Sequence, residues 1–204
     1  MRDRAKRMVD LCVAGPAFVL LLPFMIIVGA VVYCTMGGPL LFRPMRPGYK
    51  AKPFRLFKFR TMTTACDSRG ELLPDRDRLT RLGKFLRRYS LDELPQLWNV
   101  LRGDMSLVGP RPLPMQYLSR YSPEQARRHE VNPGLTGWAQ VNGRNALDWE
   151  ERFQLDIWYV DHRSFSLDAQ ILLKTLLKVL RGEDVSCRGH ATMPEFLGNN
   201  PPGL

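Results

Sequence analysis

The sequence predicts an α+β fold that is mainly helical, with a small β-hairpin or sheet and an apolar N-terminal helix in a membrane. Three observations support this prediction. The 32 positions between Asp10 and Arg43 carry no charge, residues 54–62 alternate between apolar and polar side chains, and most other patterned segments are helical. We expect a membrane helix over residues 1–36, one globular domain over 37–190 and a loose tail over 191–204.

The uncharged segment is long enough for a membrane, but a proline interrupts it. As one straight helix its 32 residues would measure about 48 Å, whereas the hydrocarbon core is roughly 30 Å thick. Pro23 removes a helical hydrogen bond near the middle and leaves two arms, each roughly 24 Å long and too short to cross. This favours a re-entrant helix broken at Pro23, with a kinked spanning helix as the alternative. The run is too long for a cleavable signal peptide.

Composition and charge restrict the partners. The chain has 204 residues, of which 45% are hydrophobic, so it can bury a core. Thirty Lys and Arg against 20 Asp and Glu give a net charge of +10, which indicates nucleic acid, anionic lipid or a phosphorylated substrate. Basic residues flank the apolar run at 2–7 and 43–60, as expected if both flanks lie against one anionic leaflet. The scattered cysteines and histidines predict no zinc site, disulfide framework or catalytic triad.

The globular part alternates short elements with loops. Residues 54–62 predict a half-buried strand with Phe54 and Leu56 facing a core. We expect helices over 79–88, 90–101 and 123–129, a loop over 63–77, turns over 103–114 and a glycine-rich loop over 132–145. Residues 167–180 predict an apolar helix with Lys174, Lys178 and Arg181 on one face. Either it packs in the core with a solvated basic stripe, or it is an interfacial amphipathic helix.

Asp92 and Glu93 lie in the segment richest in reactive side chains. Ser90 followed by Glu93 is the pattern of a capping box, which is a purely structural explanation for the acids. Two adjacent carboxylates are also suited to Mg²⁺ when phosphate oxygens complete its coordination. Arg111 lies between two prolines that stiffen the backbone, as an oxyanion contact requires. The glycine-rich run 133–144 is suited to a nucleobase and ribose.

Three motifs together resemble the bacterial sugar transferase family, the monotopic polyprenyl-phosphate phosphoglycosyl transferases. They are KFRTM at residues 58–62, SLDELPQLWNVLRGDMSLVGPRP at 90–112 and PGLTGWAQVNGRN at 133–145. They occur in this order behind the basic-flanked apolar segment, and the similarity extends over about residues 3–190. The short chain is similar to the small, single-domain (PglC-like) members.

The resemblance implies an enzyme that is monotopic in the bacterial inner (plasma) membrane, with its catalytic domain on the cytoplasmic face. Such an enzyme moves sugar-1-phosphate from a UDP-sugar to undecaprenyl phosphate and releases UMP, the first membrane step of glycan assembly. The resemblance makes Asp92 the nucleophile of a covalent phosphosugar intermediate and Glu93, with Asp92, the ligand of Mg²⁺. An aspartate of ordinary pKa is ionised at neutral pH and needs no base.

The same resemblance implies further binding residues. The cations expected around the phosphates are Lys58, Arg60, Arg87 and Arg111, and weaker candidates for nucleotide or sugar contacts are Gln140 and Arg144. The family breaks its membrane helix at a Ser-Pro pair. Here Leu22 precedes Pro23, so the bend depends on the proline without a serine hydroxyl.

Two alternatives remain at this point. One is a non-catalytic basic membrane scaffold of a glycan-assembly complex, against which the acid and arginine motifs argue. The other is an enzyme that transfers the phosphosugar in one direct step. The partners we expect are a UDP-sugar, undecaprenyl phosphate and anionic membrane lipid, and no nucleic acid. The resemblance slightly favours an N-acetylated sugar and indicates neither the pathway nor the oligomeric state.

Overall fold

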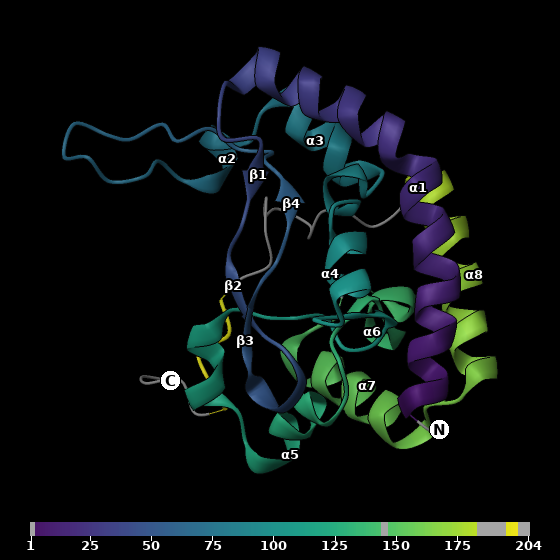
Figure 1. Ribbon diagram of the computed structural model, residues 1–204. Coiled ribbons are helices and arrows are strands. Elements are labelled where there is room, and N and C mark those ends of the chain that lie inside the picture. Colours follow the sequence, from purple (N-terminus) through teal and green to yellow (C-terminus); the bar gives the residue numbers. More distant parts are fainter. Residues whose placement is uncertain (1–2, 144–146, 183–194, 200–204) are drawn as a thin grey trace.

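The computed structural model describes residues 3–143, 147–182 and 195–199. Helix α1 (Asp3–Met36) runs along one side of the globular part and then turns across its top (Figure 1). Three two-stranded sheets and several short helices make up the rest. This confirms the predicted fold class, mainly helical with small sheets.

Helix α1 continues through Pro23 without interruption, but its two arms pack against different parts of the protein. Ala14 belongs to the larger core cluster, whereas Met25 and Val32 pack with Phe59 in a second cluster. The change of partner falls in the turns around Pro23, where the missing backbone N–H permits a bend. The structure therefore has a bent continuous helix where we expected a helix broken in two.

Polar side chains tie the first turns of α1 to the globular part. Asp10, 2% exposed, accepts hydrogen bonds from the Ser106 hydroxyl at 2.8 Å and the Leu107 amide at 3.2 Å. Lys6 joins Asp10 at 2.8 Å to Asp168 of helix α8 (Phe165–Arg181) at 2.9 Å. Buried ionic contacts of this kind are costly to break, so they fix the N-terminal arm in place.

The predicted strand 54–62 is divided between two antiparallel sheets. Strand β3 (Pro53–Arg55) pairs with β2 (Met45–Pro47), and β4 (Lys58–Phe59) pairs with β1 (Leu41–Phe42). Phe54, Leu56 and Phe59 are buried, which confirms the predicted inward side chains. At the break, the fully buried Asn99 side chain accepts from the Phe57 amide at 3.0 Å and donates to the Arg55 carbonyl at 2.8 Å. The amide thereby replaces ladder hydrogen bonds that the strand has lost.

Short helices and one parallel pair complete the fold. Strand β5 (Ser106–Val108) pairs in parallel with β6 (Gly134–Thr136). The predicted loop 132–145 therefore contains a strand and also α6 (Trp138–Asn142). The other α-helices are α2 (Asp75–Arg78), α3 (Arg81–Arg88), α4 (Gln96–Arg102), α5 (Pro123–Ala126) and α7 (Trp149–His162). The 3₁₀ turns are η1 (Tyr49–Ala51), η2 (Leu91–Glu93), η3 (Met115–Arg120) and η4 (Arg127–Glu130).

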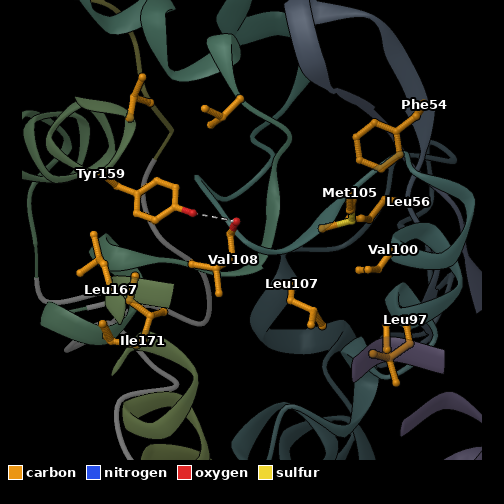
Figure 2. Packing of buried hydrophobic residues seen from close by; sticks show 14 residues of the cluster. Phe54, Leu56, Leu97, Val100, Met105, Leu107, Val108, Tyr159, Leu167 and Ile171 are labelled. Carbon is orange, nitrogen blue, oxygen red and sulfur yellow. Dashed lines mark hydrogen bonds between the residues drawn. The ribbon is translucent and has the colours of Figure 1, made fainter. Parts of the chain in front are cut away.

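The main core forms where β5 meets α4, α7 and α8 (Figure 2). Val100, Met105 and Ile171 are completely buried there. The Tyr159 hydroxyl donates to the Val108 carbonyl at 3.1 Å and lies 2.8 Å from an Asp168 oxygen. Buried phenols need such partners, so the α7–β5–α8 junction is held by hydrogen bonds as well as by packing.

Helix α8 presents leucines, not lysines, to the outside. Leu173, Leu176 and Leu180 are exposed, whereas Lys174 is half-buried with its ammonium 4.8 Å from the centre of the Trp138 ring. The exposed side chains of α1 are also large and apolar, and only 22% of its most apolar stretch is buried. A core helix of a soluble protein would be mostly buried. The two helices thus expose the kind of apolar surface that associates with a membrane.

Part of the expected loose tail is packed. Phe196 is 4% exposed among aromatic rings, and its amide donates to the Tyr117 hydroxyl at 3.1 Å. Glu195 accepts from Arg120 at 2.7 Å. The expectation of a loose tail over 191–204 is therefore wrong for residues 195–199, because an aromatic cluster elsewhere in the chain receives Phe196. The predicted boundary at residue 190 lies outside the described residues.

Candidate active site

A cavity of about 650 Å³ lies between β4, η2, α3 and the loop after β5. Seven of the eight predicted site residues line it, namely Lys58, Arg60, Arg87, Asp92, Glu93, Arg111 and Gln140. They come from five separate stretches of the chain. The eighth, Arg144, lies outside the described residues. Other lining residues, which the sequence analysis did not single out, include Arg46, Gln96, Tyr117, Trp149 and Arg152.

The turn that carries Asp92 and Glu93 is not a capping box. Ser90 has left-handed backbone angles (φ 53°), and its side chain makes no capping hydrogen bond. The residues Leu91–Glu93 form a 3₁₀ turn, and α4 begins only after Pro95. The structural explanation for this pair of acids is therefore wrong, because the Glu93 carboxylate leaves the helix end and points to cations in the cavity.

Glu93 is held by two cations. One carboxylate oxygen lies 2.6 Å from Lys58 Nζ and 2.5 Å from Arg111 Nη2, and the other lies 3.3 Å from Arg111 Nη1. Burial alone would raise the pKa of Glu93, but the charges and hydrogen bonds of Arg111 and Lys58 outweigh it and hold the pKa well below its usual range. Glu93 is thus ionised at any physiological pH.

Asp92 has the opposite environment. Its side chain is 7% exposed, and in residues 3–143, 147–182 and 195–199 no hydrogen bond or ion pair ties its carboxylate to another group. Burial, followed by the neighbouring charge of Glu93, raises the pKa of Asp92 above the ordinary value, although Lys58, Arg87 and Arg111 oppose this. From the sequence we expected an ordinary pKa. The structure corrects this, because the carboxylate is buried and has no partner within the described residues.

Arg111 is fixed from behind. Its carbonyl accepts from Arg128 Nη2 at 2.8 Å, and the same guanidinium forms a fully buried ion pair with Asp156 at 2.6 Å. The charge of Glu93 raises the pKa of Arg111 above its ordinary value, although burial opposes this. Since both the backbone and the guanidinium are held, Arg111 is preorganised for an oxyanion.

Arg87 reaches the cavity because α3 lies very close to the segment after β4. A Cβ atom on Gly83 would be 2.0 Å from the Thr61 carbonyl oxygen, so only glycine permits this approach. Arg87 then donates from Nε to the Thr61 hydroxyl at 3.1 Å. Burial lowers the pKa of Arg87, and the charge of Asp92 opposes this. The Thr61 contact therefore holds the Arg87 guanidinium at the wall of the cavity that Asp92 also lines.

Arg60 has a different part in the structure from the one expected. Its guanidinium donates to the carbonyls of Gly38 at 3.0 Å and Gly37 at 2.7 Å, and also to that of Met36 at the end of α1. These carbonyls carry the negative end of the helix dipole and have no intrahelical donors. Arg60 thus lines the cavity but directs its charge to the end of the membrane helix.

The acids of the cavity suit one divalent cation bound together with phosphate. In the described part of the chain no three His, Cys, Asp or Glu side chains form a metal cluster. Within the part of the chain that the structure describes, Asp92 has no partner and the second oxygen of Glu93 has only the 3.3 Å contact. Mg²⁺ commonly uses one or two carboxylates and completes its shell with phosphate oxygens and water. These two side chains therefore fit Mg²⁺ when a phosphorylated substrate is present.

Comparisons with known proteins identify the family of the chain. The profile of the Bacterial sugar transferase family matches residues 1–182. The uncharacterized sugar transferase EpsL of Bacillus subtilis is 58% identical over 170 residues, which cover 83% of this chain and 84% of that protein.

Longer relatives have names that state a substrate. The UDP-glucose:undecaprenyl-phosphate glucose-1-phosphate transferase of Xanthomonas campestris is 40% identical over 86% of this chain, and the match covers 39% of its own length. The UDP-N-acetylgalactosamine-undecaprenyl-phosphate N-acetylgalactosaminephosphotransferase of Aeromonas hydrophila is 37% identical over 87% of this chain and 44% of its own length. The chain thus spans less than half of these two relatives, whose names support the sugar-phosphate transferase class. With the family profile covering nearly all of it, the chain belongs to the bacterial sugar transferase family.

Proposed function

We propose that this protein transfers sugar-1-phosphate from a UDP-sugar to undecaprenyl phosphate and releases UMP. The observation that carries the proposal is the pair of unlike carboxylates in one cationic cavity: Glu93 is held by Lys58 and Arg111, whereas Asp92 is buried and has no partner among the described residues. The names of the relatives support a UDP-sugar donor and an undecaprenyl-phosphate acceptor.

The reaction has two displacements at phosphorus. An Asp92 oxygen attacks the β-phosphorus of the UDP-sugar, the bond from that phosphorus to the bridging oxygen breaks, and UMP leaves with the electron pair. An oxygen of undecaprenyl phosphate then attacks the same phosphorus, and the bond to Asp92 breaks. The lipid receives the phosphosugar as a diphosphate, and the carboxylate is restored. Arg87 and Arg111 bind and orient the phosphate oxygens, whose negative charge would otherwise repel the incoming carboxylate.

Asp92 and Glu93 are the residues that would hold Mg²⁺. The ion would neutralise the diphosphate and make phosphorus a better electrophile. Glu93 also keeps Lys58 and Arg111 at the edge of the cavity, whatever else is bound.

The experiment that tests the function measures UMP release by the purified full chain with undecaprenyl phosphate, Mg²⁺ and a panel of UDP-sugars. We expect release that depends on the lipid and on at least one sugar nucleotide. A non-catalytic scaffold would give none with any member of the panel. Transfer of label from UDP-[¹⁴C]sugar to the protein, before the lipid is added, distinguishes the covalent route from a one-step route.

How both ends of α1 are held supports a proposal for the membrane arrangement. Its first turns are tied to Ser106 and Asp168, and its C-terminal carbonyls are tied to Arg60 of the same globular part. A helix whose two ends are fixed to one domain cannot place them on opposite sides of a bilayer. We therefore propose a monotopic protein whose bent α1 enters one leaflet from the cytoplasmic face, with α8 against anionic lipid at the interface.

Cysteine labelling tests this arrangement. Two single-cysteine variants are made in a background otherwise free of cysteines: one keeps the exposed Cys66, which marks the projecting arm between β4 and α3, and the other carries Arg4→Cys at the start of α1. We expect a membrane-impermeant maleimide to label neither site in intact cells and both after permeabilisation. Labelling of the Arg4→Cys site from outside would show that α1 spans the membrane, and the cysteine-free background is the control.

A further inference from the structure

Among the basic side chains of the cavity, Arg46 is the one for which the described residues provide no hydrogen-bond, ion-pair or ring partner. Seven basic and four acidic side chains line the cavity. Six of the basic ones have partners: Glu93 for Lys58 and Arg111, Asp75 for Arg78, helix-end carbonyls for Arg60, the Thr61 hydroxyl for Arg87 and the Trp149 ring for Arg152. Arg46 is the seventh, and within the residues that the structure describes no acid pairs with it.

Arg46 is positioned as a binding residue rather than a surface charge. It lies in the middle of β2, opposite Phe54, and is half-buried, and its Nε is buried without a hydrogen-bond partner. Burial lowers the pKa of Arg46, and the charge of Arg111 lowers it further. Two guanidinium groups that repel each other at a cavity wall are unfavourable in the empty protein. An anion between them would remove this cost and satisfy the unused donors.

Contacts along the cavity wall place Arg111 between the acids and Arg46. One Arg111 nitrogen lies 2.5 Å from a Glu93 oxygen, and Glu93 directly follows Asp92 in the chain. Arg111 also lines a small pocket together with Pro47, the residue after Arg46 in β2. Beyond Arg46, Tyr117 packs against Trp149 with their rings at 89°, and both residues line the cavity. The groups along the cavity are thus, in order, Asp92, Arg111, Arg46 and the rings of Tyr117 and Trp149.

We infer that Arg46 and Arg111 together bind the phosphate of the UDP-sugar that is attached to the nucleoside, the one that leaves as UMP, with the nucleoside toward Tyr117 and Trp149. This inference rests on the proposed function. If the β-phosphorus is at Asp92, the next phosphate is at the position between the two arginines. Negative charge develops on that phosphate as its bond to the β-phosphorus breaks, so a forked guanidinium there stabilises the leaving group. Arg46 takes no part in the attack by the lipid phosphate.

The test uses Arg46→Gln in the full chain. In a two-step mechanism kcat/KM for the UDP-sugar reports the steps through UMP release, and kcat/KM for undecaprenyl phosphate reports the later steps. We expect the first to fall about 10-fold or more, the effect of about 1.4 kcal/mol, and the second to change less than about twofold. UDP, titrated calorimetrically without lipid, should bind about 10-fold more weakly.

The matched control is Arg43→Gln, two residues before the start of β2. Arg43 is exposed, lies over the Phe57 ring and does not line the cavity. It should leave all three quantities unchanged. Arg46→Lys retains the charge and the aliphatic stem but not the fork, so it should give a smaller loss of UDP affinity and guards against misfolding of Arg46→Gln. The inference is overturned if UDP binds Arg46→Gln as it binds the wild type, or if Arg43→Gln weakens it equally. Absence of wild-type UMP release would refute the proposed function instead.

Discussion

Replacing Asp92 by asparagine should abolish phosphosugar transfer, with kcat/KM lower by about 10⁴-fold, the usual order for loss of a nucleophile. The amide has the same shape but cannot form the phosphosugar ester, so no label from UDP-[¹⁴C]sugar should remain on the denatured protein.

The same substitution should make the protein more stable by about 1 kcal/mol at neutral pH, because it removes a buried carboxylate that has no partner among the described residues.

The pH dependence of this gain has a definite sign. The pKa of Asp92 is raised in the folded protein, so the folded state binds this proton more tightly than the unfolded state does. Stability then falls as pH rises from the ordinary value of about 3.9 through the raised pKa. The advantage of Asp92→Asn should therefore be small in acid and complete above the raised pKa. Urea denaturation at several pH values measures it.

Asp77→Asn provides the control for this substitution, because Asp77 is an exposed acid whose contact is with Arg76 at 3.6 Å. It should change neither transfer nor stability appreciably. Appreciable transfer by Asp92→Asn would exclude the covalent route. A loss of stability in that variant would show that the folded protein stabilises the Asp92 charge.

Replacing Glu93 by glutamine should have the opposite effect on stability. Without the carboxylate, Lys58 and Arg111 face each other uncompensated, so the protein should lose about 2–3 kcal/mol at pH 7, somewhat less than for a completely buried pair. Transfer should fall about 10²- to 10³-fold, because both cations move from the positions at which they meet phosphate.

The pH window for Glu93 also differs in sign from that for Asp92. The pKa of Glu93 is depressed in the folded protein, so its stabilising contribution is present above the unfolded value of about 4.3 and is lost as pH falls toward the folded pKa. The difference between wild type and Glu93→Gln should shrink below about pH 4. Glu130→Gln, at an exposed acid paired with Arg127, is the control. Equal stability of Glu93→Gln and wild type at pH 7 would contradict the stabilising contact of Glu93 with Lys58 and Arg111.

Local patterns in the sequence anticipated much of this protein. The uncharged run predicted α1, and the alternation around Phe54 predicted which side chains are buried. Helix α7 was not anticipated, although Asp148 and Glu151 form a capping box at its start. Its buried side includes the charged residues Arg152 and Asp156, and Trp158 is exposed, so the pattern is not simply apolar and burial depends on the surrounding partners.

The sequence indicated which residues form the site, but only the structure showed which partners each of them contacts. The motifs and the family resemblance indicated Asp92, Glu93 and Arg111 without a structure. That Ser90 does not cap, and that Glu93 turns to Lys58 and Arg111, depends on two segments 35 and 18 residues away. The assignment of Arg60 to the end of α1 and the burial of Phe196 are also long-range contacts. Local spacing contains no information about such partners.

The sequence by itself determined the long apolar helix, the mainly helical class and the acids and arginines available for phosphate chemistry, because these depend on side-chain type and short-range periodicity. Only the tertiary structure decided which acid is clamped and which has no partner, that both ends of α1 are held by one domain, and that Arg46 faces the cavity. Burial and ion pairing change a side chain's pKa and its freedom to react, and both arise from residues brought together across the fold.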